Sequence, residues 1–96
     1  MLPSQALASK RSRVLALATA RGARSVRVFG SVASASDREG SDLDLLVDMP
    51  AGTSLLHIVG LQLDLEDELG IKVDVCTERE LHPELKARIL AQARPL

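Results

Sequence analysis

The sequence VRVFGSVASASDREGSDLDLLVD, residues 26–48, decides the fold of this chain. It predicts one strand that ends before Gly30-Ser31, a turn at these two residues, a polar segment, and a second strand. Asp42 and Asp44 lie two residues apart at the start of the second strand. Because side chains alternate between the two faces of a strand, we expect both carboxylates to point to the same face.

The same stretch combines residue types that suit a metal–nucleotide site. Two neighbouring carboxylates repel each other unless a cation lies between them, and Mg²⁺ binds carboxylate oxygens, water and substrate phosphates. Gly30 allows the backbone to approach a phosphate closely, and a helical turn after it would direct N–H groups at the anion. We therefore expect Asp42 and Asp44 to bind metal and Gly30-Ser31 to bind phosphate.

The spacing of these residues resembles the signature of the DNA polymerase beta-like nucleotidyltransferases. Gly30-Ser31 is followed by ten residues and then by Asp42-x-Asp44. The small chain and its later segment Lys-Val-Asp-Val, residues 72–75, look like the minimal nucleotidyltransferase (MNT) branch. That branch includes the MntA-type antitoxins, which are paired with HEPN-domain toxins. The resemblance covers residues 14–96, and its three-part pattern is more specific than an isolated Asp-x-Asp.

The resemblance implies an antitoxin enzyme, a protein adenylyltransferase that transfers AMP from ATP to a tyrosine hydroxyl of a cognate HEPN RNase toxin and so neutralises it. It implies two Mg²⁺ ions held by Asp42, Asp44 and Asp74, which would be the catalytic residues. Asp74 is also the candidate general base. Gly30 and Ser31 would bind the β- and γ-phosphates of ATP. A hetero-oligomer with the toxin is the expected assembly.

The order of the predicted elements indicates an α/β (α+β) fold, with a small mixed sheet, helices packed on one face, and an open face that carries the carboxylates. If the third strand lies beside the second, Asp74 comes close to Asp42 and Asp44. The expected helices span 4–20, 54–69 and 83–91, the strands span 25–29, 43–48 and 71–76, a helical turn follows at 31–35, and 95–96 form a tail.

Composition limits the classes of function. Because the chain has 96 residues, we expect one domain, residues 1–96. With one Phe and no Trp or Tyr, its core should be aliphatic. The net charge of −1 and the lack of aromatic residues argue against direct nucleic-acid binding. A single cysteine, Cys76, and the absence of a long apolar run favour a cytoplasmic protein without a membrane span. His57 and His82 have no second ligand at zinc spacing.

Two features leave questions for the structure. Family members commonly have Arg-Gly three and four residues after the motif serine, whereas this chain has Ser34 and Ala35; Arg38 could substitute for the missing cation. The helix 54–69 has two apolar stripes. The second stripe is expected to pack internally rather than to form a partner surface, and it consists of Leu55, Leu56, Val59 and Leu63.

Three alternatives remain open on the sequence. Asp42 and Asp44 could be charges on a strand edge that prevent aggregation. The domain could neutralise a toxin by binding alone, without catalysis. It could also transfer a nucleotide to a small-molecule acceptor.

Overall fold

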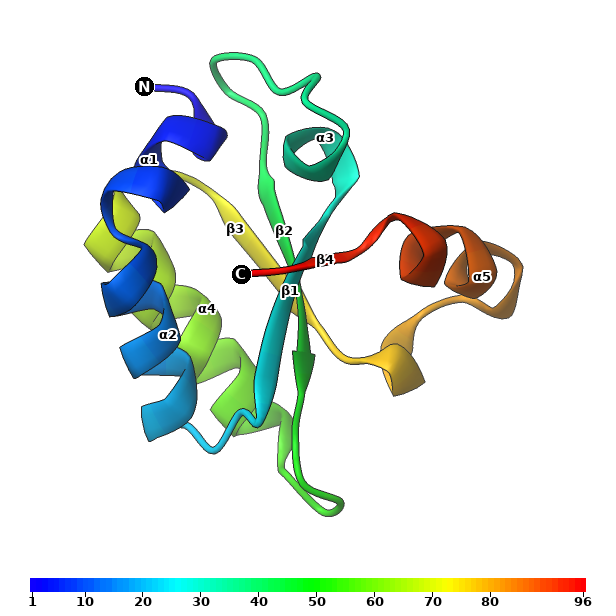
Figure 1. Ribbon diagram of the computed structural model, residues 1–96. Helices are drawn as coiled ribbons and strands as arrows, with labels where there is room; N and C mark the ends of the chain where they lie inside the picture. The colour runs from blue at the N-terminus through cyan, green and yellow to red at the C-terminus, as the bar shows by residue number, and fades with distance from the viewer.

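A four-stranded mixed sheet with the strand order β3-β2-β1-β4 forms the centre of the molecule (Figure 1). The computed structural model describes residues 1–96. Strand β2 is antiparallel to β1 and parallel to β3, and β4 is antiparallel to β1. The strands are β1 Ser25–Phe29, β2 Leu43–Asp48, β3 Val73–Cys76 and β4 Arg94–Pro95.

The helices cover the two sides of this sheet unequally. Figure 1 shows α1, α2 and α4 together on one side and α5 on the other. The predicted α/β fold with a small mixed sheet is confirmed, and the short α5 is an addition to the expected single helical layer. The helices are α1 Pro3–Ser9, α2 Arg11–Ala20, α3 Gly30–Ala33, α4 Leu55–Leu69 and α5 Pro83–Gln92, and a 3₁₀ turn, η1, spans Glu78–Glu80. No helix has the length and apolar character of a membrane span.

The core is aliphatic, as the composition predicts. Alternate residues of the strands are buried against α2 and α4, while their neighbours point to the opposite face. The core cluster includes Val14, Val28, Leu45, Leu61, Leu65 and Val73.

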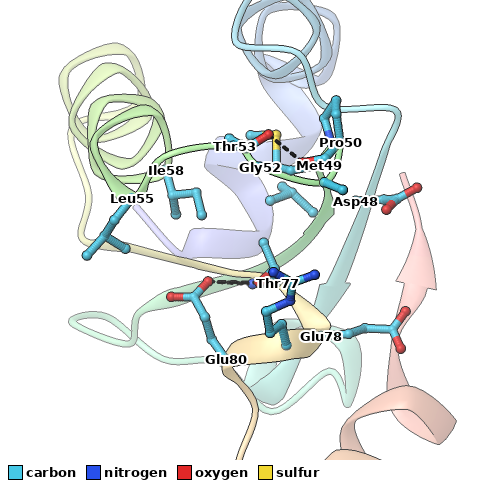
Figure 2. A pocket seen from close by; sticks show the side chains of 13 residues that line it. Asp48, Met49, Pro50, Gly52, Thr53, Leu55, Ile58, Thr77, Glu78 and Glu80 are labelled. Carbon is cyan, nitrogen blue, oxygen red and sulfur yellow. Dashed lines mark hydrogen bonds between the residues drawn. The ribbon is translucent and has the colours of Figure 1, made fainter.

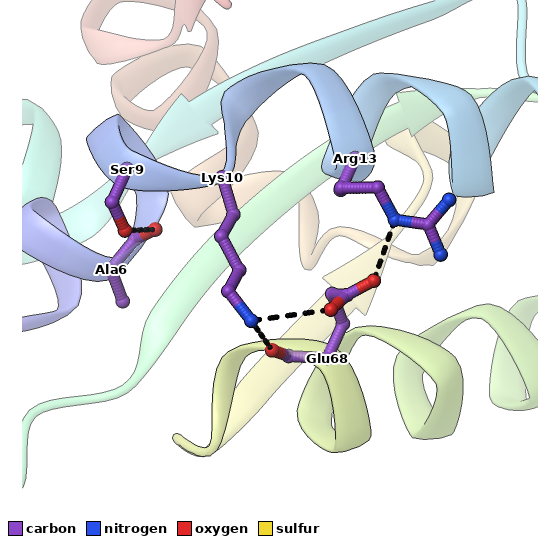
Figure 3. Close-up of polar contacts among 5 residues, drawn as sticks. All are labelled: Ala6, Ser9, Lys10, Arg13 and Glu68. Atoms are coloured by element: carbon purple, nitrogen blue, oxygen red, sulfur yellow. Dashed lines mark hydrogen bonds and ion pairs between the residues drawn. The ribbon is translucent and has the colours of Figure 1, made fainter.

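The prediction of one continuous helix over 4–20 is wrong. The helix is interrupted at Lys10, so that α1 ends at Ser9 and α2 begins at Arg11. The Lys10 backbone lies outside the helical region, with φ −127° and ψ 27°. The break is stabilised by contacts that are distant in the sequence (Figure 3). Lys10 Nζ donates to the carbonyl oxygen of Glu68 at 2.8 Å, and Arg13 Nε donates to the Glu68 carboxylate at 2.7 Å. These contacts compensate the C-terminal end of α4, where unpaired carbonyl groups favour cations.

Further boundaries differ from the prediction, and the strand expected at 71–76 begins only at Val73. Pro95 of the expected tail belongs to β4 instead, and the Leu96 amide after it donates to the Val26 carbonyl at 3.2 Å. Ser54 stands at the N-terminus of α4 and makes no capping hydrogen bond with its side chain. The Thr53 hydroxyl donates to the Pro50 carbonyl at 2.7 Å, in the turn seen in Figure 2. Gly70 ends α4 in the left-handed conformation, as predicted.

The expectation that both apolar stripes of α4 pack internally is wrong. Ile58, Leu61 and Leu65 are buried against the sheet. The main contacts of α4 are with β3 and α2, and the second stripe remains largely exposed. The exposed fractions of its residues are 62% for Leu55, 80% for Leu56, 43% for Val59 and 59% for Leu63.

Candidate active site

Asp44 and Asp74 are direct neighbours across two parallel strands. The register of β2 and β3 pairs Asp44 with Asp74 and Leu43 with Val73. Leu43 and Val73 are buried in the core, so the two aspartates point to the other face of the sheet. The structure therefore places the third predicted aspartate beside the Asp-x-Asp motif.

Asp42 stands just before β2 and is half-buried. Its neighbour Leu43 is fixed by burial and by its amide, which donates to the Lys72 carbonyl at 2.9 Å. This hydrogen bond joins the beginnings of β2 and β3, where all three aspartates lie. Asp74 is exposed on β3, which is an edge strand of the sheet.

Gly30 lies against Asp44, because β1 pairs Phe29 with Asp44. A Cβ atom added to Gly30 would overlap Asp44 Oδ2 and would lie 3.0 Å from Asp44 Cγ. Gly30 also has a φ of 71°, in the left-handed region that favours glycine. The turn therefore needs glycine for two independent reasons, its conformation and the close approach of a carboxylate.

The site is electrostatically crowded with negative charge. Burial, together with the neighbouring charges of Asp74 and Asp42, raises the pKa of Asp44 to about 6. Burial and neighbouring negative charges destabilise the ionised form of a carboxylate when no cation is beside it.

The three aspartates are the kind of ligand that a magnesium site needs, but their side chains do not converge on a common point where a metal ion could bind. No group of three or more His, Cys, Asp or Glu side chains has an arrangement that could hold a metal ion. Asp42, Asp44 and Asp74 supply only carboxylate oxygens, which Mg²⁺ prefers. A divalent cation among them would offset the repulsion that raises the pKa of Asp44. Their role as metal ligands stays a prediction.

Comparison with known proteins decides the family. Residues 14–96 match the model of the nucleotidyltransferase domain. The chain belongs to the nucleotidyltransferase domain family. Among solved structures it is similar to one titled "Structure of putative minimal nucleotidyltransferase", with a TM-score of 0.85 and 47% identity, covering 97% of this chain and 95% of that one. The predicted family, fold and enzyme class are thus confirmed.

Curated relatives carry related names. The chain is 41% identical over 81 residues to "Putative protein adenylyltransferase MJ0435" of Methanocaldococcus jannaschii, covering 84% of this chain and 87% of the relative. It is 35% identical over 71 residues to "Protein adenylyltransferase MntA" of Thermococcus cleftensis, covering 74% and 72%. A structure titled "Crystal structure of the toxin-antitoxin with AMP-PNP" shares the fold, with a TM-score of 0.77, 19% identity, and coverage of 88% and 69%.

The turn that is predicted to bind phosphate in this nucleotidyltransferase, here called the phosphate turn, has the expected shape. Helix α3 begins at Gly30 directly after β1, close to the predicted 31–35. Its first N–H groups have no acceptor within the helix, which suits an anion. However, the Gly30 amide already donates to the side chain of Gln92 at 3.0 Å. Sequence analysis missed this contact, since Gln92 comes from α5, 62 residues away.

The two positions where this nucleotidyltransferase departs from its family lie at the end of α3. Ala35 is the only non-glycine residue with positive φ, at 57°. The family commonly has glycine there, so the left-handed backbone is retained while the residue that suits it is not. The Ser34 hydroxyl donates to the carbonyls of Gly30 and Ser31 at 3.2 and 3.3 Å, which holds it within the turn.

Cations near the phosphate turn are supplied by other elements. A shallow pocket of about 600 Å³ is lined by Gly30, Phe29, Gln92 and Arg88. Arg88 forms no ion pair within the chain, and neither does Arg38 in the loop before β2. Arg88 is therefore a second candidate, besides Arg38, for the missing cation. Only the position of α5 reveals it.

A better-enclosed cavity of about 390 Å³ lies at the opposite end of β2 (Figure 2). Asp48, Met49, Thr53 and Thr77 are among its lining residues, and none of the predicted site residues reaches it. The cavity contains neither the motif turn nor the paired carboxylates, so the site is still predicted at the aspartates rather than there.

Cys76, the last residue of β3, is a half-buried free thiol. Its pKa is raised to about 12 by burial and by the charges of Asp74, Glu80 and Asp44. A thiol with a raised pKa is a poor nucleophile. His82 caps α5, because its Nδ1 accepts from the Glu84 amide at 3.3 Å.

Proposed function

We propose that this nucleotidyltransferase is an antitoxin that transfers AMP from Mg-ATP to a tyrosine hydroxyl of a cognate HEPN RNase toxin. The pairing of Asp44 with Asp74 beside Gly30 is the observation that carries the proposal. Support comes from relatives named protein adenylyltransferase, one of them MntA. Residues 1–96 would act as one minimal catalytic domain.

The roles proposed for the residues are those that the family resemblance implies. Gly30 and Ser31 at the start of α3 would bind the β- and γ-phosphates through backbone N–H groups, and the Gly30 amide would exchange its contact with Gln92 for a phosphate oxygen. Asp42, Asp44 and Asp74 would hold two Mg²⁺ ions, which supply charge neutralisation at the phosphates when bound. Asp74 would accept the proton of the acceptor hydroxyl. The new bond joins that oxygen to the α-phosphorus, and the bond to pyrophosphate breaks.

The exposure of Asp74 favours a protein acceptor. Asp74 is on the edge strand β3, so a large partner can bring a hydroxyl to it from outside the sheet. A small molecule would need an enclosed site for most of its surface, and the cavity seen in Figure 2 lies at the other end of β2.

Intact mass of the toxin, co-expressed with this chain, tests the proposal. With the wild-type chain, the toxin should gain the mass of one or more AMP groups and lose RNase activity. With Asp42→Ala/Asp44→Ala the mass should stay unchanged and the toxicity should return. Asp48→Ala is a matched control, because Asp48 is an exposed aspartate at the other end of β2.

The same experiment distinguishes an antitoxin that transfers AMP from one that neutralises the toxin by binding alone. If the double variant still neutralises the toxin fully and no AMP is ever added, the chain is a binding antitoxin without catalysis. AMP addition that requires Asp42 and Asp44 excludes that alternative.

A further inference from the structure

The exposed residues Leu55, Leu56, Val59 and Leu63 form an apolar stripe along α4, here called the α4 stripe. Three of them, Leu56, Val59 and Leu63, are spaced three and four residues apart. This is the spacing at which helices pack side by side in coiled coils. A stripe of this kind on a small domain marks a surface that another helix covers.

The charges at the two ends of α4 are placed opposite to what the helix itself favours. The last turns carry Asp64, Glu66, Asp67 and Glu68, while the first turn has no acidic residue and no side-chain cap. Acidic groups are unfavourable near a helix C-terminus and favourable near an N-terminus. The first turn of α4 therefore lacks the acidic groups that its last turns carry.

Most of these acidic groups are satisfied within the chain, with one exception. Lys10 and Arg13 pair with Glu68, and Arg21 pairs with Asp64. The Glu66 carboxylate accepts from the Val73 amide at 3.0 Å. Asp67 is exposed and has neither a cation nor a hydrogen-bond donor beside it. It is the acidic group that remains available to a partner.

The neighbouring sheet edge is closed to strand addition. The outward amides of β3 are those of Val73 and Val75, and they donate to Glu66 and Gln62 of α4 at 3.0 and 3.1 Å. A partner on this side therefore cannot extend the sheet by backbone hydrogen bonds. It must pack side chains against the α4 stripe, as a helix does.

We propose that the α4 stripe binds the α4 stripe of a second copy of this chain, with the two helices antiparallel around a two-fold axis near Val59. This arrangement brings Leu55 and Leu56 towards Leu63 of the partner subunit, so apolar residues meet only apolar residues. It also places Asp67 beside the uncapped first turn of the opposite helix, which corrects the charge imbalance at both ends. A parallel arrangement would set acidic ends against each other.

The shape of the surroundings is compatible with this packing. Leu55 also lies at the rim of the cavity in Figure 2, so the apolar surface continues from the α4 stripe to Met49 and Ile58. Two such short helices bury an area at the low end of specific interfaces. We therefore expect a dimer that dissociates on dilution through the micromolar range.

Sedimentation velocity of the full chain over a dilution series tests the proposal. The wild type should shift from dimer to monomer on dilution. Val59→Asp should weaken the dimer at least tenfold, because it sets two carboxylates against each other at the axis. Asp67→Lys should also weaken it, without changing the apolar seam. Leu85→Asp is the matched control, an exposed leucine on α5, and should dimerise like the wild type.

A cross-link checks the position of the axis independently of folding. In a Cys76→Ser background, Val59→Cys should form a disulfide-linked dimer under mild oxidation much faster than Leu85→Cys. The proposal is overturned if the wild type stays monomeric at every concentration, which would leave the α4 stripe to a different protein. It is also overturned if Val59→Asp dimerises as well as the wild type, or if the two cysteine variants cross-link equally.

Discussion

Gly30 and Asp44 are in such close contact that no side chain fits between them: a Cβ atom on Gly30 would overlap the Asp44 carboxylate. The motif glycine and the motif aspartate are therefore one structural unit, although thirteen residues separate them in the sequence. The glycine sets the position of the carboxylate as well as the shape of the phosphate turn.

Gly30→Ala should destabilise the domain by about 2–3 kcal/mol, because it adds a steric overlap to the cost of a left-handed alanine. It should also abolish magnesium-dependent ATP binding in calorimetry. Gly40→Ala is the matched control, since Gly40 has a φ of 84° and open space where its Cβ would lie. That control should show only the conformational cost, about 1 kcal/mol, with ATP binding retained. Equal losses in both variants would contradict the close contact.

The raised pKa of Asp44 predicts an unusual dependence of stability on pH in the absence of metal. The folded-state pKa of about 6 exceeds the unfolded value of 3.8, so folding favours the protonated form. The associated stability is fully present below pH 3.8 and is lost as the pH rises through 6. Between pH 5 and pH 8, the metal-free domain should therefore lose about 1 kcal/mol of stability from this group, after a discount for its solvent exposure.

Asp44→Asn removes this contribution. In chelator-treated samples, the variant should unfold at a higher temperature than the wild type at pH 8, and the difference should shrink towards pH 5. Asp37 and Glu68, whose pKa values are lowered by the Ser4 amide and by Arg13, change protonation below this range and do not interfere. If the difference in unfolding temperature stayed constant from pH 5 to pH 8, the pKa of Asp44 would not be raised by burial and its neighbours. Added Mg²⁺ should remove the advantage of the variant.

The strands and the motif were predictable because their signals are local. The alternation of apolar and polar residues gave the bounds of β1 and β2 correctly. The break at Lys10 was not predictable, because no glycine or proline marks it and its contact with Glu68 is 58 residues distant. The contact of Gln92 with Gly30 depends in the same way on where α5 packs. Likewise, helical periodicity identified the α4 stripe but could not tell whether anything would cover it.

The left-handed backbone at Ala35 predicts that glycine at this position would stabilise the domain. Ala35→Gly should stabilise the domain by about 1 kcal/mol, because the backbone there has a φ of 57°. Ala33→Gly, at the last residue of α3, should instead destabilise it, which controls for a general effect of glycine in this turn. Thermal unfolding of the three proteins measures both effects. An unchanged or lowered unfolding temperature for Ala35→Gly would show that the strain is absent.

The cation that the family carries near the phosphates is the last testable feature. Arg88 lines the pocket beside Gly30 and has no carboxylate partner, so it is free to bind a phosphate oxygen. Arg88→Ala should weaken Mg-ATP binding about tenfold in calorimetry, whereas Arg79→Ala, an exposed arginine on η1 at the far cavity, should leave it unchanged. Ser34→Arg, which restores the residue common in the family, should recover part of the affinity lost in Arg88→Ala. If Arg88→Ala binds Mg-ATP like the wild type while Arg38→Ala does not, the loop arginine provides the cation instead.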